Sequence, residues 1–263
     1  MAEKPVEDTL GLTAADMGAK DGESELVAIS AGQIRSALLT QPLTLCSVVP
    51  FGLINAYGCG TGSRLIWSQF GWGALGWYVA LLLRLPVIGI AKALNLKPQT
   101  LQLCAVLASG PCEETVRALA LWAWPGHHDF VSAFSLGLGW ASIEAVFTVV
   151  QGLAMIHLLG KNDDKALEAR RKMIEFLGRD TAQDSPLWAP LERLSANMGH
   201  IWFSLAARLH PAVAVPIALL HSCVNWGTVS SVARHGIARA EMGLFAFSLS
   251  AFVAVFFATR PTL

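Results

Sequence analysis

Apolar residues are grouped along this chain into seven long stretches that are separated by shorter polar segments. Each stretch approaches the ~20 predominantly apolar residues that an α-helix needs to cross a bilayer. We therefore predict an all-α, polytopic integral membrane protein with about seven transmembrane helices in one bundle. The predicted spans cover residues 36–57, 69–91, 98–124, 130–159, 187–208, 211–232 and 240–258.

Two segments depart from this pattern, and each predicts a local structure. Ser109-Gly110-Pro111 interrupts the third stretch, and proline inside a helix removes a hydrogen bond and kinks or breaks the helix. The freed carbonyl groups are tolerated in a membrane where they face protein or water, so this break favours a hydrated pocket beside Glu113. The charged segment 160–186 predicts a cytoplasmic helix with a solvated face.

The composition supports the membrane interpretation. Of the 263 residues, 54% are hydrophobic and 14% are charged, whereas soluble domains contain about 25% charged residues. The mean hydropathy is +0.49 and the net charge is zero, so nothing favours a nucleic-acid partner. We divide the chain into a polar cytoplasmic N-terminal arm (1–35), without the pattern of a cleaved signal peptide, and a transmembrane helical domain (36–263).

The distribution of lysine and arginine predicts the orientation of the helices. The N-terminal arm and the connections that follow the second, fourth and sixth spans hold far more Lys and Arg than the other connections. Cytoplasmic loops carry such an excess. We therefore expect a multi-pass protein whose N-terminus is cytoplasmic and whose C-terminus lies on the opposite side.

Four of the predicted spans carry ionisable side chains near their middle. A charged residue at the centre of a bilayer costs at least ~2.5–3.5 kcal/mol, so such residues normally face the protein interior and serve a function. We therefore predict one shared polar site inside the membrane, within a catalytic core at about 98–232. The residues concerned are Glu113, Glu114, Arg117, Glu144, His200, His221 and Asn225.

The spacing in the third span places two carboxylates beside one arginine. Glu113 lies four residues and Glu114 three residues before Arg117, so either carboxylate can reach the guanidinium on one helix face. Either the arginine neutralises one glutamate, or the two adjacent carboxylates resist ionising together. Both arrangements suit a general base that activates water. An ion pair that only holds helices together is the structural alternative.

Glu144, His200 and His221 provide side chains typical of catalytic zinc, which takes three protein ligands and leaves one position for water. Glu144 belongs to a glycine-rich segment, 137–144, that permits close helix approach. Asn225 lies four residues after His221, so it could orient the imidazole or donate to a developing oxyanion. A glutamate/histidine mechanism without a bound metal is the alternative.

These motifs resemble the YhfC family of intramembrane metalloproteases, which is related to the CAAX prenyl protease and bacteriocin-processing enzymes and to PrsW. The similar segments are EETVR (113–117), FSLGLGWASIEAVF (134–147), LERLSANMGHIWFS (191–204) and LLHSCVNW (219–226). The glycine-rich motif of YhfC-like chains usually reads Gly-His-Gly-Gly-x-Glu. Here Glu144 matches its glutamate, whereas Trp140 stands at the position of its histidine.

The resemblance implies an intramembrane metalloprotease-like endopeptidase that hydrolyses a membrane-embedded or membrane-proximal peptide bond. Glu114, or Glu113, would activate the attacking water, and His200 would bind zinc or assist the base. His221 and Asn225 would complete the metal or oxyanion site. The expected partners are a membrane peptide or protein substrate and the lipid bilayer.

Two other classes of function are compatible with the sequence. The wider group includes a noncatalytic member, the scaffold subunit of γ-secretase, which resembles this chain in its seven-span layout and its paired mid-span histidines. A scaffold of this kind would bind partner subunits, although this chain keeps both glutamates. A proton- or ion-coupled transporter would use the buried carboxylates as carriers, but such folds often show internal repeats, and we find none.

Overall fold

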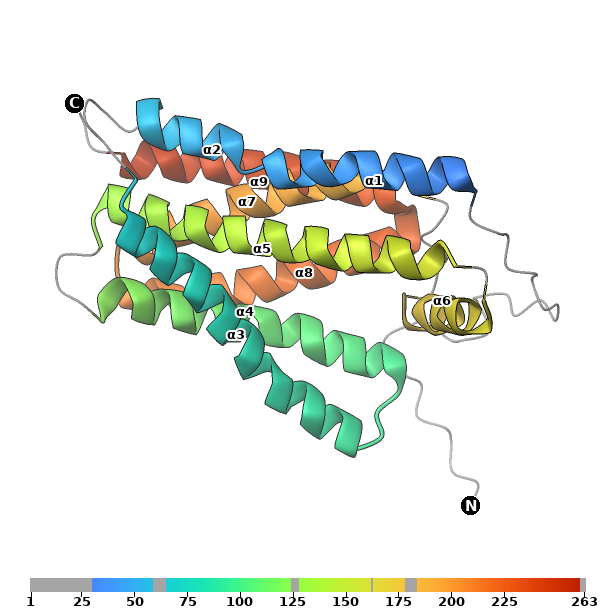
Figure 1. Cartoon of the computed structure of the whole chain (residues 1–263). Helices are drawn as coiled ribbons and strands as arrows, with labels where there is room; N and C mark the ends of the chain where they lie inside the picture. Colours follow the sequence, from blue (N-terminus) through green and yellow to red (C-terminus); the bar gives the residue numbers. More distant parts are fainter. Residues whose placement is uncertain (1–29, 59–64, 124–127, 162, 178–183, 261–263) are drawn as a thin grey trace, which may run out of the picture.

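The computed structural model describes residues 30–58, 65–123, 128–161, 163–177 and 184–260, which form helices without any strand (Figure 1). Most of the predicted N-terminal arm, residues 1–29, lies outside this part of the chain. The elements in order are α1 (Ala31–Cys46), α2 (Val49–Leu53), the π-helix η1 (Ile54–Gly58), α3 (Trp67–Ala93), α4 (Pro98–Trp122), α5 (Phe130–Leu159), α6 (Asp164–Leu177), α7 (Trp188–Ala207), the 3-10 helix η3 (Pro211–Val213), α8 (Ala214–His235) and α9 (Ile237–Thr259).

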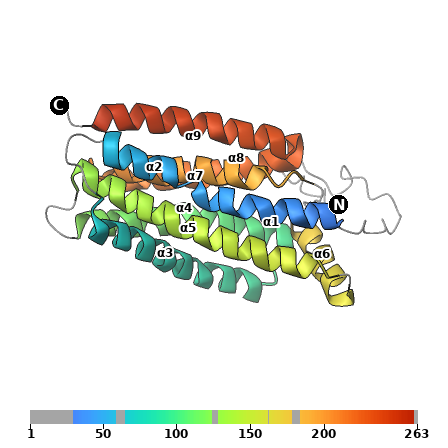
Figure 2. The same cartoon turned by 45° about the horizontal axis from the view of Figure 1, so that its top comes forward.

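The all-α prediction is confirmed for the described residues. Each of the seven apolar stretches contains one long helix, except that the first holds α1, α2 and η1 in succession and the sixth begins with η3. The charged segment 160–186 contains α6. This helix lies at one end of the bundle, against α4 and α5 (Figure 2).

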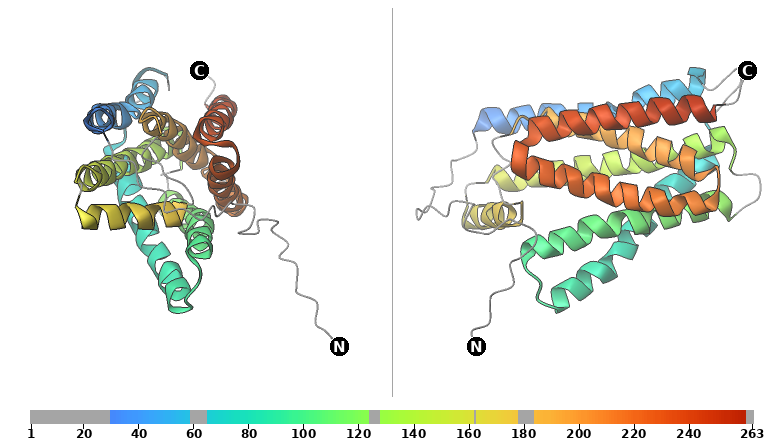
Figure 3. Two further views of the ribbon diagram at one scale, coloured as in Figure 1. Left: turned by 90° about the vertical axis from the view of Figure 1, so that its right-hand side faces the viewer. Right: turned by 180° about the vertical axis from the view of Figure 1, so that it is seen from behind.

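Six long helices pack in a closed order, in which α3, α4, α8, α9, α7 and α5 each contact the next and α5 returns to α3. The view along the bundle shows this arrangement (Figure 3). α1 lies outside the ring, against α5 and α7. Side chains that point inward from α4, α5, α7 and α8 therefore meet in the middle of the bundle.

Local sequence signals explain where several helices begin and turn. Ser30 caps α1 through a reciprocal pair of hydrogen bonds with Gln33, and Asp129 accepts the first free N–H groups of α5. α8 ends at His235 and is followed by Gly236, whose φ of 82° is a conformation that residues with a Cβ rarely adopt. This glycine lets α9 fold back directly against α8.

Small residues bring α3, α5 and α7 into close contact, as the glycine-rich segment predicts. A Cβ on Gly139 would lie 2.0 Å from the carbonyl oxygen of Phe70 on α3. A Cβ on Gly137 would lie 2.8 Å from the Cα of Ile201 on α7. A larger residue at either position would push α5 away from α3 or from α7. These two glycines therefore help to set the position of α5, and of its polar residues, relative to the neighbouring helices.

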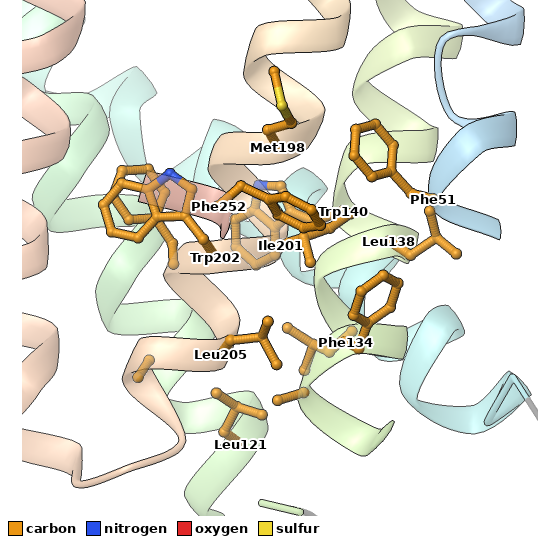
Figure 4. Packing of buried hydrophobic residues seen from close by; sticks show 14 of the residues in the cluster. Phe51, Leu121, Phe134, Leu138, Trp140, Met198, Ile201, Trp202, Leu205 and Phe252 are labelled. Carbon is orange, nitrogen blue, oxygen red and sulfur yellow. The ribbon is translucent and has the colours of Figure 1, made fainter. Parts of the chain in front are cut away.

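Buried aromatic and aliphatic side chains fill the spaces around this contact. Figure 4 shows residues from α2, α4, α5, α7 and α9 that pack together, including Phe51, Phe134, Trp140, Ile201 and Phe252. Trp140 and Phe134 are completely buried, and the rings of Phe51 and Phe252 meet edge to face. This apolar core surrounds the polar residues described below.

Five helical segments of the described chain are long and apolar enough to cross a membrane. They are Ala31–Tyr57, Trp67–Ala93, Phe130–Leu158, Pro211–His235 and Ile237–Thr259. Their outer faces carry large apolar side chains, such as Leu82, Ile90, Leu219 and Phe257, that are more than 60% exposed. Exposed apolar area of this extent is typical of a surface that faces lipid. The two remaining long helices, α4 and α7, carry most of the buried charges.

Candidate active site

The centre of the candidate site is an ion pair within α4. Glu114 is 1% exposed and Arg117 is completely buried. The Nε and Nη2 atoms of Arg117 donate to the two carboxylate oxygens of Glu114 over 2.9 and 3.4 Å. The pairing that the spacing predicts is therefore present, and both charges are enclosed by protein.

Arg117 also joins α4 to α7 and α5. Its Nη1 atom donates to the hydroxyl of Ser204 over 2.8 Å and to the backbone carbonyl of His200 over 3.1 Å. Its Nη2 atom lies 3.2 Å from Nδ1 of His200, and the guanidinium lies 4.2 Å from the centre of the Trp140 ring. Because the guanidinium offers five N–H donors in one plane, a single side chain can hold all these groups.

A break or a kink is predicted at the glycine–proline step that precedes the glutamates, and of these two the break is absent, because α4 continues through the step. Pro111 has no N–H to donate to the carbonyl of Leu107, and the hydroxyl of Ser222 on α8 donates to that oxygen instead, over 2.8 Å. A Cβ on Gly110 would lie 2.1 Å from the carbonyl oxygen of Ala218. The step therefore lets α8 pack closely against α4 beside the site.

His221 on α8 is oriented by Glu114. Its Nδ1 atom lies 2.8 Å from Oε1 of Glu114, and its ring stacks on Phe203 at a centroid distance of 4.9 Å. The carboxylate that Arg117 holds can only accept, so Nδ1 donates, and in the neutral form of the ring the lone pair is on Nε2. That nitrogen faces Oε1 of Glu113 at 3.9 Å.

Glu113 has two partners that the sequence reasoning did not assign to the site. Arg84 on α3 forms an ion pair with its Oε1 atom, and the indole N–H of Trp140 donates to Oε2 over 3.0 Å. A Cβ on Gly76 would lie 2.8 Å from the indole, so this glycine makes room for the ring. The available signals were a lone arginine within the second apolar stretch and the tryptophan at the expected histidine position.

Glu144 and His200 contact each other, but they do not join His221 in one ligand set as predicted. Nε2 of His200 bonds to Oε2 of Glu144, and its Nδ1 lies next to the Arg117 guanidinium. The neutral ring must accept at Nδ1 and donate at Nε2, so neither nitrogen has a free lone pair for a metal. The other oxygen of Glu144 forms an ion pair with Arg193 at 2.9 Å.

Asn225 bonds to Ser109 and not to His221, so of its two predicted roles the orientation of the imidazole is not seen, and donation to an oxyanion stays a prediction. Its amide nitrogen donates to the hydroxyl of Ser109 over 2.8 Å, and that hydroxyl donates in turn to the carbonyl of Val106. No bond from Asn225 to a site carboxylate is present among the described residues. Asn225 therefore links α8 to α4 one turn away from the glutamates.

Within the part of the chain that the structure describes, Glu113, Glu114 and His221 form a group that could hold a metal ion. One ligand atom from each lies within 4.8 Å of the others, and all three residues are buried. Two carboxylates and an imidazole match the donors that zinc takes, at about 2.0–2.2 Å from each atom. The donor set therefore fits zinc, provided that Glu113 gives up the ion pair between its Oε1 atom and Arg84.

The site is enclosed, whereas a hydrated pocket was expected beside Glu113. Glu113, Glu114, Arg117, His200 and His221 are each no more than 5% exposed. Arg84, whose side chain is 20% exposed, is the most accessible group in contact with Glu113. A reactant would therefore reach Glu113 most directly by displacing the Arg84 side chain.

Comparisons with known proteins identify no relative of this chain. No family model matches the chain, and neither a curated protein nor a solved structure matches it. The interpretation therefore depends on the geometry of the site and on the motifs that resemble the YhfC family.

Proposed function

We propose that the chain is a multi-pass membrane protein that crosses the bilayer seven times, with its N-terminus in the cytoplasm. Five segments meet the length and hydropathy of a span, and α4 and α7 lie between them as neighbours in the same ring. The charges that make α4 and α7 less apolar point into the protein, so they need not face lipid. The described parts of the Lys- and Arg-rich connections, which follow α3, α5 and α8, also share one end of the bundle (Figure 1).

Cysteine labelling tests this topology. In a variant without native cysteines, Lys161→Cys at the end of α5 and Leu209→Cys after α7 are treated with a membrane-impermeant maleimide. Both residues are exposed and lie at opposite ends of the bundle. We expect Lys161→Cys to react only from the cytoplasmic side and Leu209→Cys only from the other side. Reaction of both from the same side would contradict the seven-span arrangement.

We infer further that the protein hydrolyses a peptide bond within or beside the membrane, in the manner of the YhfC-like metalloproteases. The observation that carries this proposal is the position of Glu113 opposite Nε2 of His221, 3.9 Å away. Both groups can accept from one water molecule when the imidazole is neutral and Arg84 has left Oε1 of Glu113. Arg117 holds Glu114, and Glu114 fixes His221 so that Nε2 faces Glu113. The helices α4 and α8 thus supply an organised pair of proton acceptors in a buried site.

The residues can be given separate roles in hydrolysis. A water that donates to Glu113 and to His221 would attack a peptide carbonyl with its oxygen, and Glu113 would take up the proton. When the tetrahedral intermediate collapses, the C–N bond would break and Glu113 would return this proton to the leaving amine nitrogen. Arg84, released from Glu113 by the entering substrate, would donate to the developing oxyanion. Both glutamates have both oxygens engaged, but Arg117 and His221, which hold Glu114, are buried, whereas Arg84, which holds Glu113, is 20% exposed and can be displaced. Glu114 is therefore assigned the positioning role and not that of the base. This assignment prefers Glu113 among the two predicted candidates.

Zinc is compatible with this site and is not required by it. If Glu113, Glu114 and His221 held a zinc ion, it would supply Lewis-acid polarisation of water and of the peptide carbonyl. Without metal, the same residues still hold and deprotonate water. Metal analysis of the purified protein beside His221→Ala and His200→Ala separates the alternatives, because only His221 belongs to the group that could bind the ion.

Activity measurements on the glutamates test the proposed hydrolysis. Purified protein in liposomes is incubated with a set of single-span peptides, and the products are identified by mass spectrometry. Glu113→Gln and His221→Ala should each abolish cleavage, whereas Glu168→Gln on the exposed face of α6 should not change it. Full cleavage by the Glu113→Gln/Glu114→Gln double variant would exclude a glutamate base.

A noncatalytic scaffold is the second candidate, because each glutamate of the site already has hydrogen-bond or ion-pair partners within the protein. Both oxygens of Glu113 have partners, Arg84 and Trp140, and Glu114 is held by Arg117 and His221. Such a network holds α3, α4, α5 and α8 together without any reaction. A scaffold would copurify with partner subunits and would cleave none of the peptides. The glutamate variants would then lose stability or partner binding alone.

A further inference from the structure

A second polar feature lies at the end of the bundle, away from the glutamate pair. A cavity of about 660 Å³ opens between the first turns of α1, α7 and α9, the end of α5 and residues 184–186. This volume is within the range of small-molecule pockets, about 300–1,000 Å³. Most of its surface is apolar, and the side chains that supply it include Ile34, Ile156, Trp188 and Ile237.

Glu241 contributes a buried carboxylate to the wall of this cavity, and one of its oxygens has no hydrogen-bond partner among the described residues. The residue lies in the second turn of α9, lines the cavity and is only 5% exposed. Its Oε2 atom is buried without a hydrogen-bond partner among the described residues. Burying an ionised carboxylate without a partner is costly, so the position favours a ligand that provides the missing donor and the missing positive charge.

The neighbouring charges do not supply this partner. Glu192, on the α7 side of the cavity, forms an ion pair with Arg193, and Arg193 is shared with Glu144. Arg193 thus forms ion pairs with two carboxylates, those of Glu192 and Glu144. No lysine or arginine is among the described residues that line the cavity. The cavity therefore has an excess of negative charge beside an apolar surface.

We propose that this cavity binds an organic cation, an ammonium or guanidinium group carried on an alkyl chain, with Glu241 as its counter-ion. The charged group would pair with the Glu241 carboxylate at the wall of the cavity, and the alkyl chain would lie against Ile156 and Ile237. A metal ion fits less well, because calcium and magnesium require six or more oxygen ligands and the lining is mainly apolar. The proposal does not depend on the hydrolase activity.

Calorimetric titration of the purified full chain with butylguanidinium tests the proposal. Butylurea, which has the same shape without the charge, is the matched probe. We expect saturable binding of butylguanidinium only, at least about tenfold weaker to Glu241→Gln and unchanged in Glu168→Gln, an exposed carboxylate on α6. Equal affinity of wild type and Glu241→Gln, equal binding of both probes, or no saturable binding at millimolar concentrations would overturn it.

Two further measurements keep the result interpretable. Glu241→Gln should melt no lower than wild type, because it removes a buried charge that has no partner. If this variant does not fold, Ala189→Leu, which narrows the cavity and keeps Glu241, should also weaken binding; unchanged affinity would overturn the proposal. A pair of peptides with a central arginine or citrulline shows where the bound cation comes from. Selective binding of the arginine peptide indicates a basic side chain of a protein or peptide. Binding of butylguanidinium but of neither peptide indicates a free small cation.

Discussion

Replacing Arg117 with methionine tests the buried network at the centre of the bundle. Methionine keeps a long, flexible side chain, but it removes the guanidinium that holds Glu114, Ser204 and the carbonyl of His200. The carboxylate of Glu114, 1% exposed, would keep only its bond to His221. Breaking a buried pair by removing one partner costs about 3–5 kcal/mol, whereas an exposed pair contributes about 0–1 kcal/mol. We therefore expect Arg117→Met to lower the free energy of unfolding by about 3–5 kcal/mol, the range for a buried pair.

The double variant Arg117→Met/Glu114→Gln separates the charge from the packing. Glutamine leaves no carboxylate without a counter-ion, so the double variant should be more stable than the sum of the single effects predicts. The expected coupling is about 0.5–3 kcal/mol, the range for residues in one network. Arg171→Met, at an exposed position of α6, is the control and should change stability by no more than about 0.5 kcal/mol.

The measurement is reversible unfolding of the purified protein in mixed micelles, followed by circular dichroism and tryptophan fluorescence. It requires no substrate, so it tests the network whether or not the protein is an enzyme. A loss below about 1 kcal/mol for Arg117→Met would refute the reasoning, because the buried carboxylate would then have found other compensation. Additive single effects would refute it equally, since they would mean that Arg117 and Glu114 do not interact.

Three other changes have defined outcomes. Gly110→Ala should destabilise the protein by about 1–3 kcal/mol, because its Cβ would lie 2.1 Å from the Ala218 oxygen, and a Tm unchanged from wild type would contradict this. Ser222→Ala should cost about 1–3 kcal/mol in an unfolding titration, since the Leu107 carbonyl loses its donor. Excess zinc should raise the Tm of wild type but not that of His221→Ala. At a zinc concentration 100 times the Kd, the stabilisation should be about 2.7 kcal/mol. Equal Tm shifts in the two proteins would exclude Glu113, Glu114 and His221 as the ligand group.

The helices and the polar positions could be predicted from the sequence. Each apolar stretch formed a helix, because a run of about 20 apolar residues bounded by polar connections has few other stable conformations in a membrane protein. Glu113, Glu114, His200 and His221 stood out because ionisable side chains are costly inside such stretches, and they do converge in the structure. The pairing of Arg117 with a glutamate followed from helix periodicity alone.

The partners of these residues required the tertiary structure. A proline within a helix predicts a break, but Ser222 on another helix supplies the donor that keeps α4 continuous. Arg84 gave no signal beyond its position, because its partner Glu113 lies on the next helix. The grouping of possible metal ligands also depended on the tertiary structure: both ring nitrogens of His200 bond to Arg117 and Glu144, so Glu113 and Glu114 are the residues that group with His221.

The sequence by itself determined the number of helical stretches, their order and which few positions carry charge in apolar surroundings. These properties depend on periodicity and on the cost of burying charge, and both can be evaluated along one segment at a time. Only the packed bundle decided which acceptor faces which donor, because helix rotation and depth are set by contacts such as those of Gly110 and Gly139 with neighbouring helices. Whether a hydrogen bond forms depends on a few tenths of an ångström in the donor–acceptor distance. Between segments that are distant in sequence, only the tertiary packing sets this distance.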